Sequence, residues 1–290
     1  MTDRPTRRAP RARTARVVRT RNLTPHMRRV VLTGADLADL PVGDFTDHYV
    51  KLLFPPSGVE YPEPFDMRRV REEMPRELWP TTRTYTVRAW DPAHLELTLD
   101  FVIHGDSGPA GPWALRARPG DVIRLLGPGG AHAPDPDADW HLLAGDESAL
   151  PAIAASLEAL PAGARVHALV EIPGVDDRQK IATDAEIVWL ARGSRPVGEA
   201  LVEAVRNLEF PDGRVQAFVH GEAGVVKELR RHLRLERGVP REAMSISGYW
   251  RLGHDEDGWQ GSKREWNGRV EAEQEEGRGA PDGPERSDPA

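Results

Sequence analysis

The 290-residue chain contains no cysteine. Without thiols it can form no disulfides, thiolate nucleophiles or thiolate-held iron–sulfur clusters, so any redox chemistry must use a bound organic cofactor. It also lacks any apolar run near the roughly 18 residues of a membrane-spanning helix, and no signal-peptide core follows its basic start. These absences predict a cytoplasmic protein without a membrane partner.

Two further kinds of site have no sequence signature. The ten histidines show no H-E-x-x-H or related spacing, so we expect no metal held by the protein. There is no G-x-S-x-G elbow, which argues against an α/β-hydrolase, and no Ser/His/acid arrangement stands out. We therefore assign no catalytic acid or base.

The net charge of −7 conceals an asymmetry between the two ends. Residues 1–14 are basic, and we expect a disordered tail there. A basic tail can touch nucleic acid, but no aromatic residue interleaves these arginines to stack on bases, so we expect no nucleic-acid partner. For residues 258–290 we expect a short helix followed by a disordered acidic tail.

The hydrophobic pattern divides the remaining chain into two domains. Residues 15–130 contain short alternating segments separated by turn residues, which predicts a six-stranded antiparallel β-barrel. Those segments are ARVVRTR, MRRVVLTG, HYVKLLF, RTYTVR, LELTLDFVI and DVIRLL. Residues 131–139 have the Gly, Pro and Asp content of a linker, and in residues 140–257 strands alternate with helices. That alternation predicts a parallel sheet covered by helices, an α/β domain.

The long connection between the third and fourth barrel strands, residues 55–80, is polar and rich in proline. It is too long for a plain hairpin, and we expect a flexible flap.

The fourth barrel segment, RTYTVR at residues 83–88, places Arg83 two residues before Tyr85, with Thr84 and Thr86 beside them. A half-buried strand whose polar face meets water explains this composition. A flat aromatic ligand with a phosphate tail, held by the arginine, explains it as well. These residues alone leave both interpretations open.

A glycine-rich turn follows the fifth segment, in DFVIHGDSGPAGPWALRAR at residues 100–118. Pro112 stands where a short helix would begin, a favoured place for proline. Glycine lets the backbone approach a ligand, and a helix start offers free N–H groups, so Ser107 to Trp113 could cradle a pyrophosphate with Arg83 as its charged partner. A ligand-free connection fits this stretch equally well.

The loop AGDESALPA, residues 144–152, follows a strand and opens a helix, as a nucleotide site in an α/β sheet does. It has one glycine and is not a dinucleotide fingerprint. Asp146 and Glu147 would repel a phosphate, so any dinucleotide would place its nicotinamide or ribose here. Helix capping by these acids is the alternative interpretation.

Two stretches bear on the electron donor. The second strand of the α/β domain ends at Glu171, which could bind a ribose hydroxyl and favour NADH. Arg178 and Lys180 follow and could instead meet the 2′-phosphate of NADPH, so the choice stays open. YWRLGHDEDGW closes the last strand at residues 249–259, and GWQGSKREW is expected to form a final helix over the cleft.

Five stretches in this order resemble the siderophore-interacting proteins, the FAD-dependent ferric-siderophore reductases of the ferredoxin-reductase-like group. They are RTYTVR, DFVIHGDSGPAGPWA, GDESALPAIA, FVHGEAG and YWRLGHDED, within a resemblance that covers residues 15 to 266. It implies an FAD-binding barrel and an NAD(P)-binding α/β domain. Electrons would pass from NADPH or NADH through FAD to a ferric siderophore, releasing Fe(II) for intracellular use.

The same resemblance implies roles for individual residues. Arg83 would hold the FAD phosphates, Tyr85 would pack against the isoalloxazine, and Thr86 would contact its N5 region. The implied FAD contacts are Arg83, Thr84, Tyr85, Thr86, Asp100, Val102, His104, Ser107, Gly108, Ala110, Gly111 and Trp113. The implied NAD(P)H contacts are Gly145, Asp146, Glu147, Ser148, Glu171, Arg178, Gly221, Glu222, Tyr249 and Trp250. The chain departs from the family where Gly111-Pro112 replaces a frequent serine or arginine and Ser148 replaces a common threonine.

The expected reaction needs a relay because NAD(P)H gives two electrons and a ferric ion accepts one. Ferric siderophores are often anionic, so Lys51 and Arg251 are expected to guide them in. A strand lysine facing water is the alternative for Lys51. Two other functions stay open: a general flavin electron carrier that uses ferredoxin or another partner, and a non-catalytic siderophore-binding module. We expect a monomer.

Overall fold

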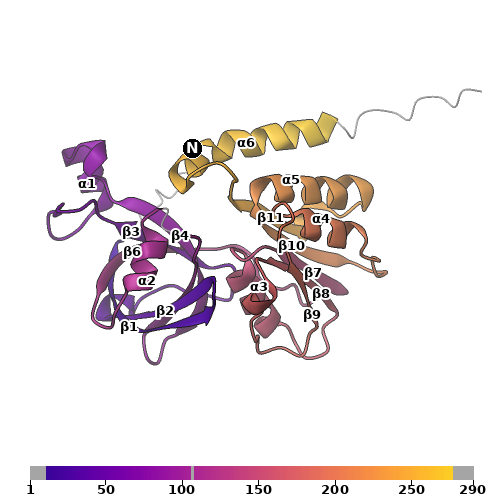
Figure 1. The fold of residues 1–290 in the computed structure, drawn as a ribbon, viewed down its shortest axis with the longest axis horizontal. Helices are drawn as coiled ribbons and strands as arrows, with labels where there is room; N and C mark the ends of the chain where they lie inside the picture. Colours follow the sequence, from indigo (N-terminus) through magenta and orange to yellow (C-terminus); the bar gives the residue numbers. More distant parts are fainter. Residues whose placement is uncertain (1–10, 106–107, 277–290) are drawn as a thin grey trace, which may run out of the picture.

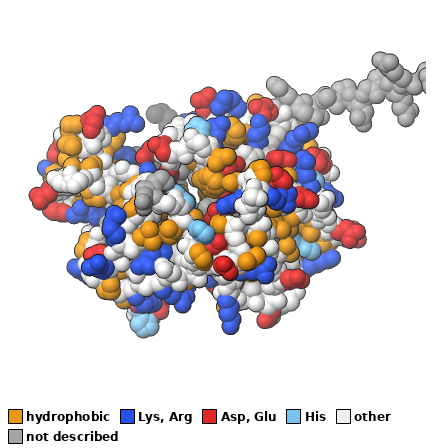
Figure 2. All heavy atoms as spheres, in the orientation of Figure 1, with side chains coloured by type: hydrophobic (Ala, Val, Ile, Leu, Met, Phe, Trp, Pro, Cys, Tyr) orange, Lys and Arg blue, Asp and Glu red, His pale blue; other side chains and the backbone are white. Residues whose placement is uncertain are grey.

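The computed structural model describes residues 11–105 and 108–276 and confirms the expected fold class. A closed six-stranded antiparallel barrel is followed by a five-stranded parallel sheet with helices on both faces (Figure 1). Positive and negative side chains are interspersed over the face in Figure 2, and the two domains lie side by side in the same orientation.

The barrel strands alternate between an apolar interior and a polar exterior. They are β1 Arg13–Thr24, β2 Met27–Thr33, β3 Tyr49–Phe54, β4 Thr81–Asp91, β5 Glu96–Val102 and β6 Val122–Gly129, in the order β1-β2-β5-β4-β3-β6. In β1, Ala15 and Val17 are buried whereas Arg16 is exposed, because successive side chains of a strand point to opposite faces.

The expected tail of residues 1–14 is corrected at its end, because β1 already begins at Arg13. The Arg13 guanidinium donates to the backbone carbonyl of Asp36 at 2.7 Å and pairs with Asp39, beside the short helix η1 Ala35–Leu37. Residues 1–10 lie outside the described residues.

Residues 55–80 contain helical structure that the sequence did not predict. They form α1 Met67–Glu73 and η2 Arg76–Leu78. Asp66 caps α1 by accepting from the Arg68 N–H at 2.7 Å, and the Trp79 indole donates to the Met74 carbonyl at 2.9 Å. In Figure 1 this segment stands at the end of the barrel away from the α/β domain.

The α/β domain has the strand order β11-β10-β7-β8-β9. Its strands are β7 Trp140–Gly145, β8 Val166–Ile172, β9 Ile187–Ala191, β10 Val215–Glu222 and β11 Met244–Trp250. Its helical segments are α3 Leu150–Ala159, η3 Val175–Asp177, α4 Glu199–Arg206, α5 Ala223–Arg231, η4 His232–Glu236 and η5 Arg241–Ala243. The central strand β7 is buried throughout, since α3 covers one face of the sheet and α4 and α5 cover the other.

The described residues end in a helix much longer than the short one expected, and the predicted acidic tail from residue 277 on lies outside them. Helix α6, Glu256–Glu276, has 21 residues and lies above α5 in Figure 1. Its far half is held by Glu271, which pairs with Arg230 at 3.2 Å and Arg241 at 2.9 Å. Near its start, Trp259 is buried. No described helix combines the length and apolar character needed to cross a bilayer.

Candidate functional site

The carboxyl ends of the parallel strands face one strand pair of the barrel, β3–β4. Tyr49 on β3 is paired with Thr86 on β4, within the RTYTVR segment. Tyr249, near the end of β11, lies near Asp47 and Tyr49 of the barrel domain. Burial raises the pKa of the Tyr249 phenol, and these neighbours add to the effect. The predicted flavin and nicotinamide sides therefore meet.

Arg83 and Tyr85 form the barrel side of this junction. The Tyr85 ring packs on Phe101 with centroids 4.1 Å apart, and burial raises the pKa of its phenol, which stays protonated. The Arg83 side chain is only 12% exposed. Its Nη1 donates to the Thr82 carbonyl at 2.8 Å and to Asp257 at 3.1 Å.

Two carboxylates of α6 flank this arginine. The Glu256 side chain lies 3.5 Å from Arg83 Nε and accepts from the Thr84 N–H at 3.0 Å. Within the described part of the chain, Nη2 of Arg83 has no hydrogen-bond partner. One end of the guanidinium can therefore still bind an anion.

The turn after β5 adds a second surface suited to a phosphate. Gly105 and Gly108 both have left-handed backbone, with φ of 73° and 72°, which favours glycine. Helix α2, Ala110–Arg116, starts directly afterwards and carries the predicted Ala110, Gly111 and Trp113. The Trp113 ring packs on Phe101 at 5.6 Å. His104 is exposed at the end of β5, and Ser107 lies outside the described residues.

These residues fit FAD. A flavin needs an aromatic wall, which Tyr85 and the rings behind it provide. Its diphosphate needs a cation and approachable backbone, which Arg83 and the glycine turn provide.

Two residues predicted to contact FAD also have structural tasks, and their contact with FAD stays a prediction. The Asp100 carboxylate is buried and accepts two hydrogen bonds from Arg29, at 2.6 and 2.7 Å. The Val102 side chain packs against the apolar cluster that includes α3. Both lie at the domain interface, which the chain order alone does not reveal.

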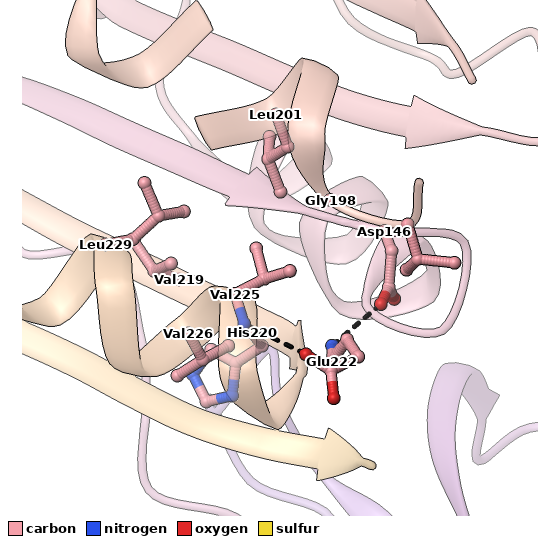
Figure 3. A pocket seen from close by; sticks show the side chains of 10 residues that line it. Asp146, Gly198, Leu201, Val219, His220, Glu222, Val225, Val226 and Leu229 are labelled. Carbon is pink, nitrogen blue, oxygen red and sulfur yellow. Dashed lines mark hydrogen bonds between the residues drawn. The ribbon is translucent and has the colours of Figure 1, made fainter. Parts of the chain in front are cut away.

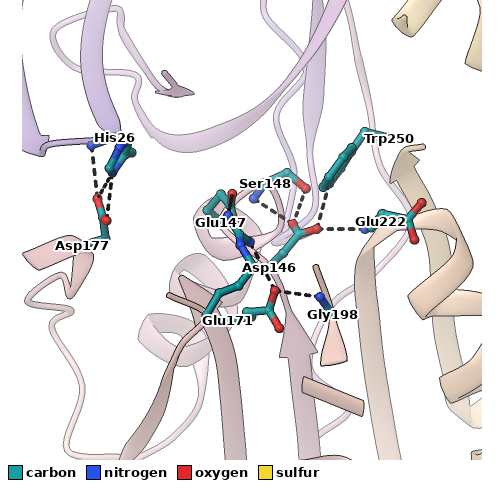
Figure 4. Close-up of polar contacts among 10 residues, drawn as sticks. His26, Asp146, Glu147, Ser148, Glu171, Asp177, Gly198, Glu222 and Trp250 are labelled. Carbon is teal, nitrogen blue, oxygen red and sulfur yellow. Dashed lines mark hydrogen bonds and ion pairs between the residues drawn. The ribbon is translucent and has the colours of Figure 1, made fainter. Parts of the chain in front are cut away.

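Asp146 holds the nicotinamide side together (Figure 4). Its Oδ1 accepts from Ser148 N and Oγ, at 2.9 and 2.5 Å. Its Oδ2 accepts from Glu222 N and the Trp250 indole, each at 2.8 Å. Burial raises the pKa of Asp146, and these donors oppose the shift. One carboxylate thus orients three other predicted site residues.

The two predicted glycines of this side are required by packing. A Cβ at Gly145 would lie 2.5 Å from the His220 carbonyl oxygen. A Cβ at Gly221, whose φ is 139°, would lie 2.6 Å from the Asp146 carboxylate. Strands β7 and β10 can approach this closely only with glycine there.

The structure contradicts the prediction that the Glu171 side chain binds a ribose hydroxyl. Its side chain is fully buried and accepts from Gly198 N at 2.8 Å and Leu201 N at 3.3 Å, at the start of α4. Arg192 links it to Glu147, at 3.2 and 3.4 Å. Burial and the nearby Asp146 raise the pKa of Glu147.

Arg178, exposed after η3, remains a candidate for a nucleotide phosphate. A small pocket lies deeper, between β10 and helices α4 and α5 (Figure 3). Its volume of about 10 Å³ and its mostly apolar lining leave room for no more than about one water molecule, so it is no nucleotide site.

Helix α6 supplies residues that the sequence analysis did not assign to the site. Lys263 is half-buried; burial lowers its pKa, and the positive charge of nearby Lys51 adds to the effect. Arg251 lies with its guanidinium 4.0 Å from the centre of the Trp266 ring. The aromatic and basic residues in GWQGSKREW were the available signal, but which face of the helix would meet the cleft depends on packing.

Comparison with known proteins decides the family. The model of the siderophore-interacting FAD-binding domain matches residues 16–132, and that of the siderophore-interacting protein matches residues 138–253. The chain belongs to the siderophore-interacting protein family. Helix α6 lies beyond both matched ranges.

Members of this family with related sequences include named reductases. The chain is 35% identical over 255 residues to ferric vibriobactin reductase ViuB of Vibrio cholerae, covering 83% of this chain and 90% of that protein. It is 32% identical over 241 residues to the NADPH-dependent ferric-chelate reductase of Escherichia coli, covering 81% and 91%. A solved siderophore utilization protein from T. fusca is 38% identical with a TM-score of 0.73, covering 85% and 95%.

Proposed function

We propose that this protein is an NAD(P)H-dependent, FAD-containing ferric-siderophore reductase that acts in the cytoplasm as a monomer and releases Fe(II). The observation that carries the proposal is the meeting of two half-sites. The strand pair bearing Arg83, Tyr85 and Thr86 faces the strand ends that bear Asp146 and Tyr249. The named ferric reductases among its relatives support the same activity.

Each half-site has a task in this proposal. Bound FAD would supply the exchange between a two-electron donor and a one-electron acceptor. Arg83 binds the phosphates through its free Nη2, and Tyr85 supports the ring as a neutral phenol. Asp146 keeps Trp250 and Ser148 oriented for the nicotinamide and ribose.

The ferric siderophore binds where the barrel meets α6. Lys51 on β3 and Lys263 on α6 lie close enough to repel each other electrostatically. An anionic chelate placed between them relieves this repulsion, which favours binding without any protein ligand to iron. Arg251, whose guanidinium lies over the Trp266 ring of helix α6, adds a third positive charge to this proposed substrate site.

Anaerobic spectroscopy tests the proposal. Protein reconstituted with FAD should absorb near 450 nm, lose that band on adding NADPH or NADH, and regain it on adding a ferric siderophore. The faster nucleotide identifies the donor. A band bleached only by a ferredoxin system would indicate the electron-carrier alternative. Failure to bind FAD, with ferric siderophore still bound, would indicate a binding module.

A further inference from the structure

A row of charges, buried at Arg88 and Asp100 and more exposed at Glu158, crosses the boundary between the two domains. Arg88, the last residue of RTYTVR, donates from Nη1 and Nη2 to the two carboxylate oxygens of Glu158, at 2.7 and 2.6 Å. Arg88 belongs to barrel strand β4, and Glu158 belongs to α3 of the α/β domain. Such a two-pronged pair fixes direction as well as distance.

The row continues into the barrel. Arg88 Nε lies 3.9 Å from Asp100, and Asp100 is held by Arg29. The side chains of Arg88 and Asp100 are 9% and 1% exposed. Two positive and two negative groups thus alternate, and Arg88 sits at a register shift in the β4–β5 ladder that directs its side chain out of the regular pairing.

Arg88 shares a strand with the flavin half-site, and Glu158 lies on the helix that follows the nicotinamide half-site. Thr86 precedes Arg88 by two residues on β4. Helix α3 begins at Leu150, directly after the loop with Asp146 and Ser148, and carries Glu158 near its other end. A second contact between the same domains joins Thr46 to Ser156 of α3, with their hydroxyl oxygens 2.7 Å apart.

We propose that Arg88 and Glu158 are positioning residues that set the separation of the nicotinamide and flavin half-sites. The inference rests on the proposed function, because it concerns electron transfer between those sites. The pair joins strand β4, which carries the FAD contacts Arg83 to Thr86, to helix α3, which follows the loop with the nicotinamide contacts. Displacing one reactant by about 1 Å can slow a reaction about 100-fold.

Two variants test the pair in the FAD-loaded protein. Glu158→Gln removes the charge but keeps the shape, and Arg88→Lys keeps the charge but loses the two-pronged geometry. Both should lower the rate of flavin reduction by saturating NAD(P)H at least tenfold. The FAD dissociation constant and the rate of flavin reoxidation by ferric siderophore should stay within about twofold of wild type. Glu203→Gln, which breaks the exposed pair with Arg195 inside the α/β domain, is the matched control.

A measurement on the apoprotein adds an independent readout. Because the chain has no cysteine, Leu115→Cys on the barrel and Val188→Cys on β9 permit specific spin labelling at two exposed positions. Glu158→Gln should broaden the distance distribution between the labels, and Glu203→Gln should leave it unchanged.

Unchanged reduction rates, an unbroadened distribution, or an equal loss in both half-reactions would each overturn the proposal. A wild-type protein that NAD(P)H does not reduce would instead refute the proposed function on which it rests.

Discussion

Arg83 links the two domains at the level of a single side chain. It contacts two acids of α6, and among the described residues its Nη2 has no hydrogen-bond partner. We expect Arg83→Ala to weaken FAD binding by about 2 kcal/mol, about 30-fold in dissociation constant, since hydrogen bonds to charged groups contribute about 1.5 to 3 kcal/mol. Titration of the apoprotein with FAD, followed by flavin fluorescence, measures this.

Arg124→Ala is the matched control, because that barrel arginine pairs with Glu63 in the segment between β3 and β4. Equal FAD affinity in wild type and Arg83→Ala would remove Arg83 from the phosphate site.

Lys51 and Lys263 provide a second prediction for single side chains. We expect Lys51→Ala and Lys263→Ala each to raise KM for an anionic ferric chelate several-fold with little change in kcat, because each removes a guiding charge. The effect should shrink at high salt, where charges are screened. A neutral ferric chelate is the control substrate. An unchanged KM for the anionic chelate would exclude that lysine from the site.

Among the elements, α6 has the clearest separate task. It brings Glu256 to Arg83, Lys263 to Lys51, and Trp266 to Arg251. Ending the chain after Asp257 removes most of this helix, and we expect kcat/KM for the ferric siderophore to fall at least tenfold while the 450 nm band persists. That expectation follows because the FAD contacts of the barrel remain in place.

A chain ended after Glu276 is the control, since it keeps the whole helix. Turnover that is the same in both truncated proteins would show that α6 has no role in substrate binding.

At the scale of the whole molecule, two buried histidines couple stability to pH. His132 in the linker packs on Phe218 of β10 with ring centroids 4.8 Å apart, and His220 stacks on the same ring at 3.9 Å. Burial lowers the pKa of His132 to about 4 and that of His220 to about 3. Both stay neutral in the folded protein at neutral pH.

This pKa depression predicts the direction of the pH effect. Below pH 6.5 the unfolded chain binds protons at these positions that the native protein does not, so stability falls from pH 6.5 towards pH 4. At pH 5 we expect each histidine to cost about 2 kcal/mol relative to pH 7.5. Urea unfolding at both pH values measures this loss of stability. Because His132→Asn removes one of the two histidines, we expect the loss in that variant to be about 2 kcal/mol smaller than in wild type. An equal loss in that variant would contradict the assignment.

Local patterns carried most of the fold. Alternating residues such as Ala15, Arg16 and Val17 identify a strand because side chains alternate in any strand, whatever it later pairs with. The absence of cysteine is also a property of the chain alone, and it is the reason to expect an organic cofactor for any redox chemistry. The order of the five motifs indicated the family, which the comparisons confirm.

Tertiary structure decided which polar side chains remain available to a ligand. Glu171 and Asp100 carry the right chemistry for a site, but one caps α4 and the other binds Arg29, because a buried carboxylate must be paired. Lys51 with Lys263, and Arg88 with Glu158, are far apart in the chain and meet only after folding. The alternation of apolar and polar residues that marks a strand involves only neighbours in the chain, so it can be read from the sequence. Charge pairing instead depends on how the domains pack.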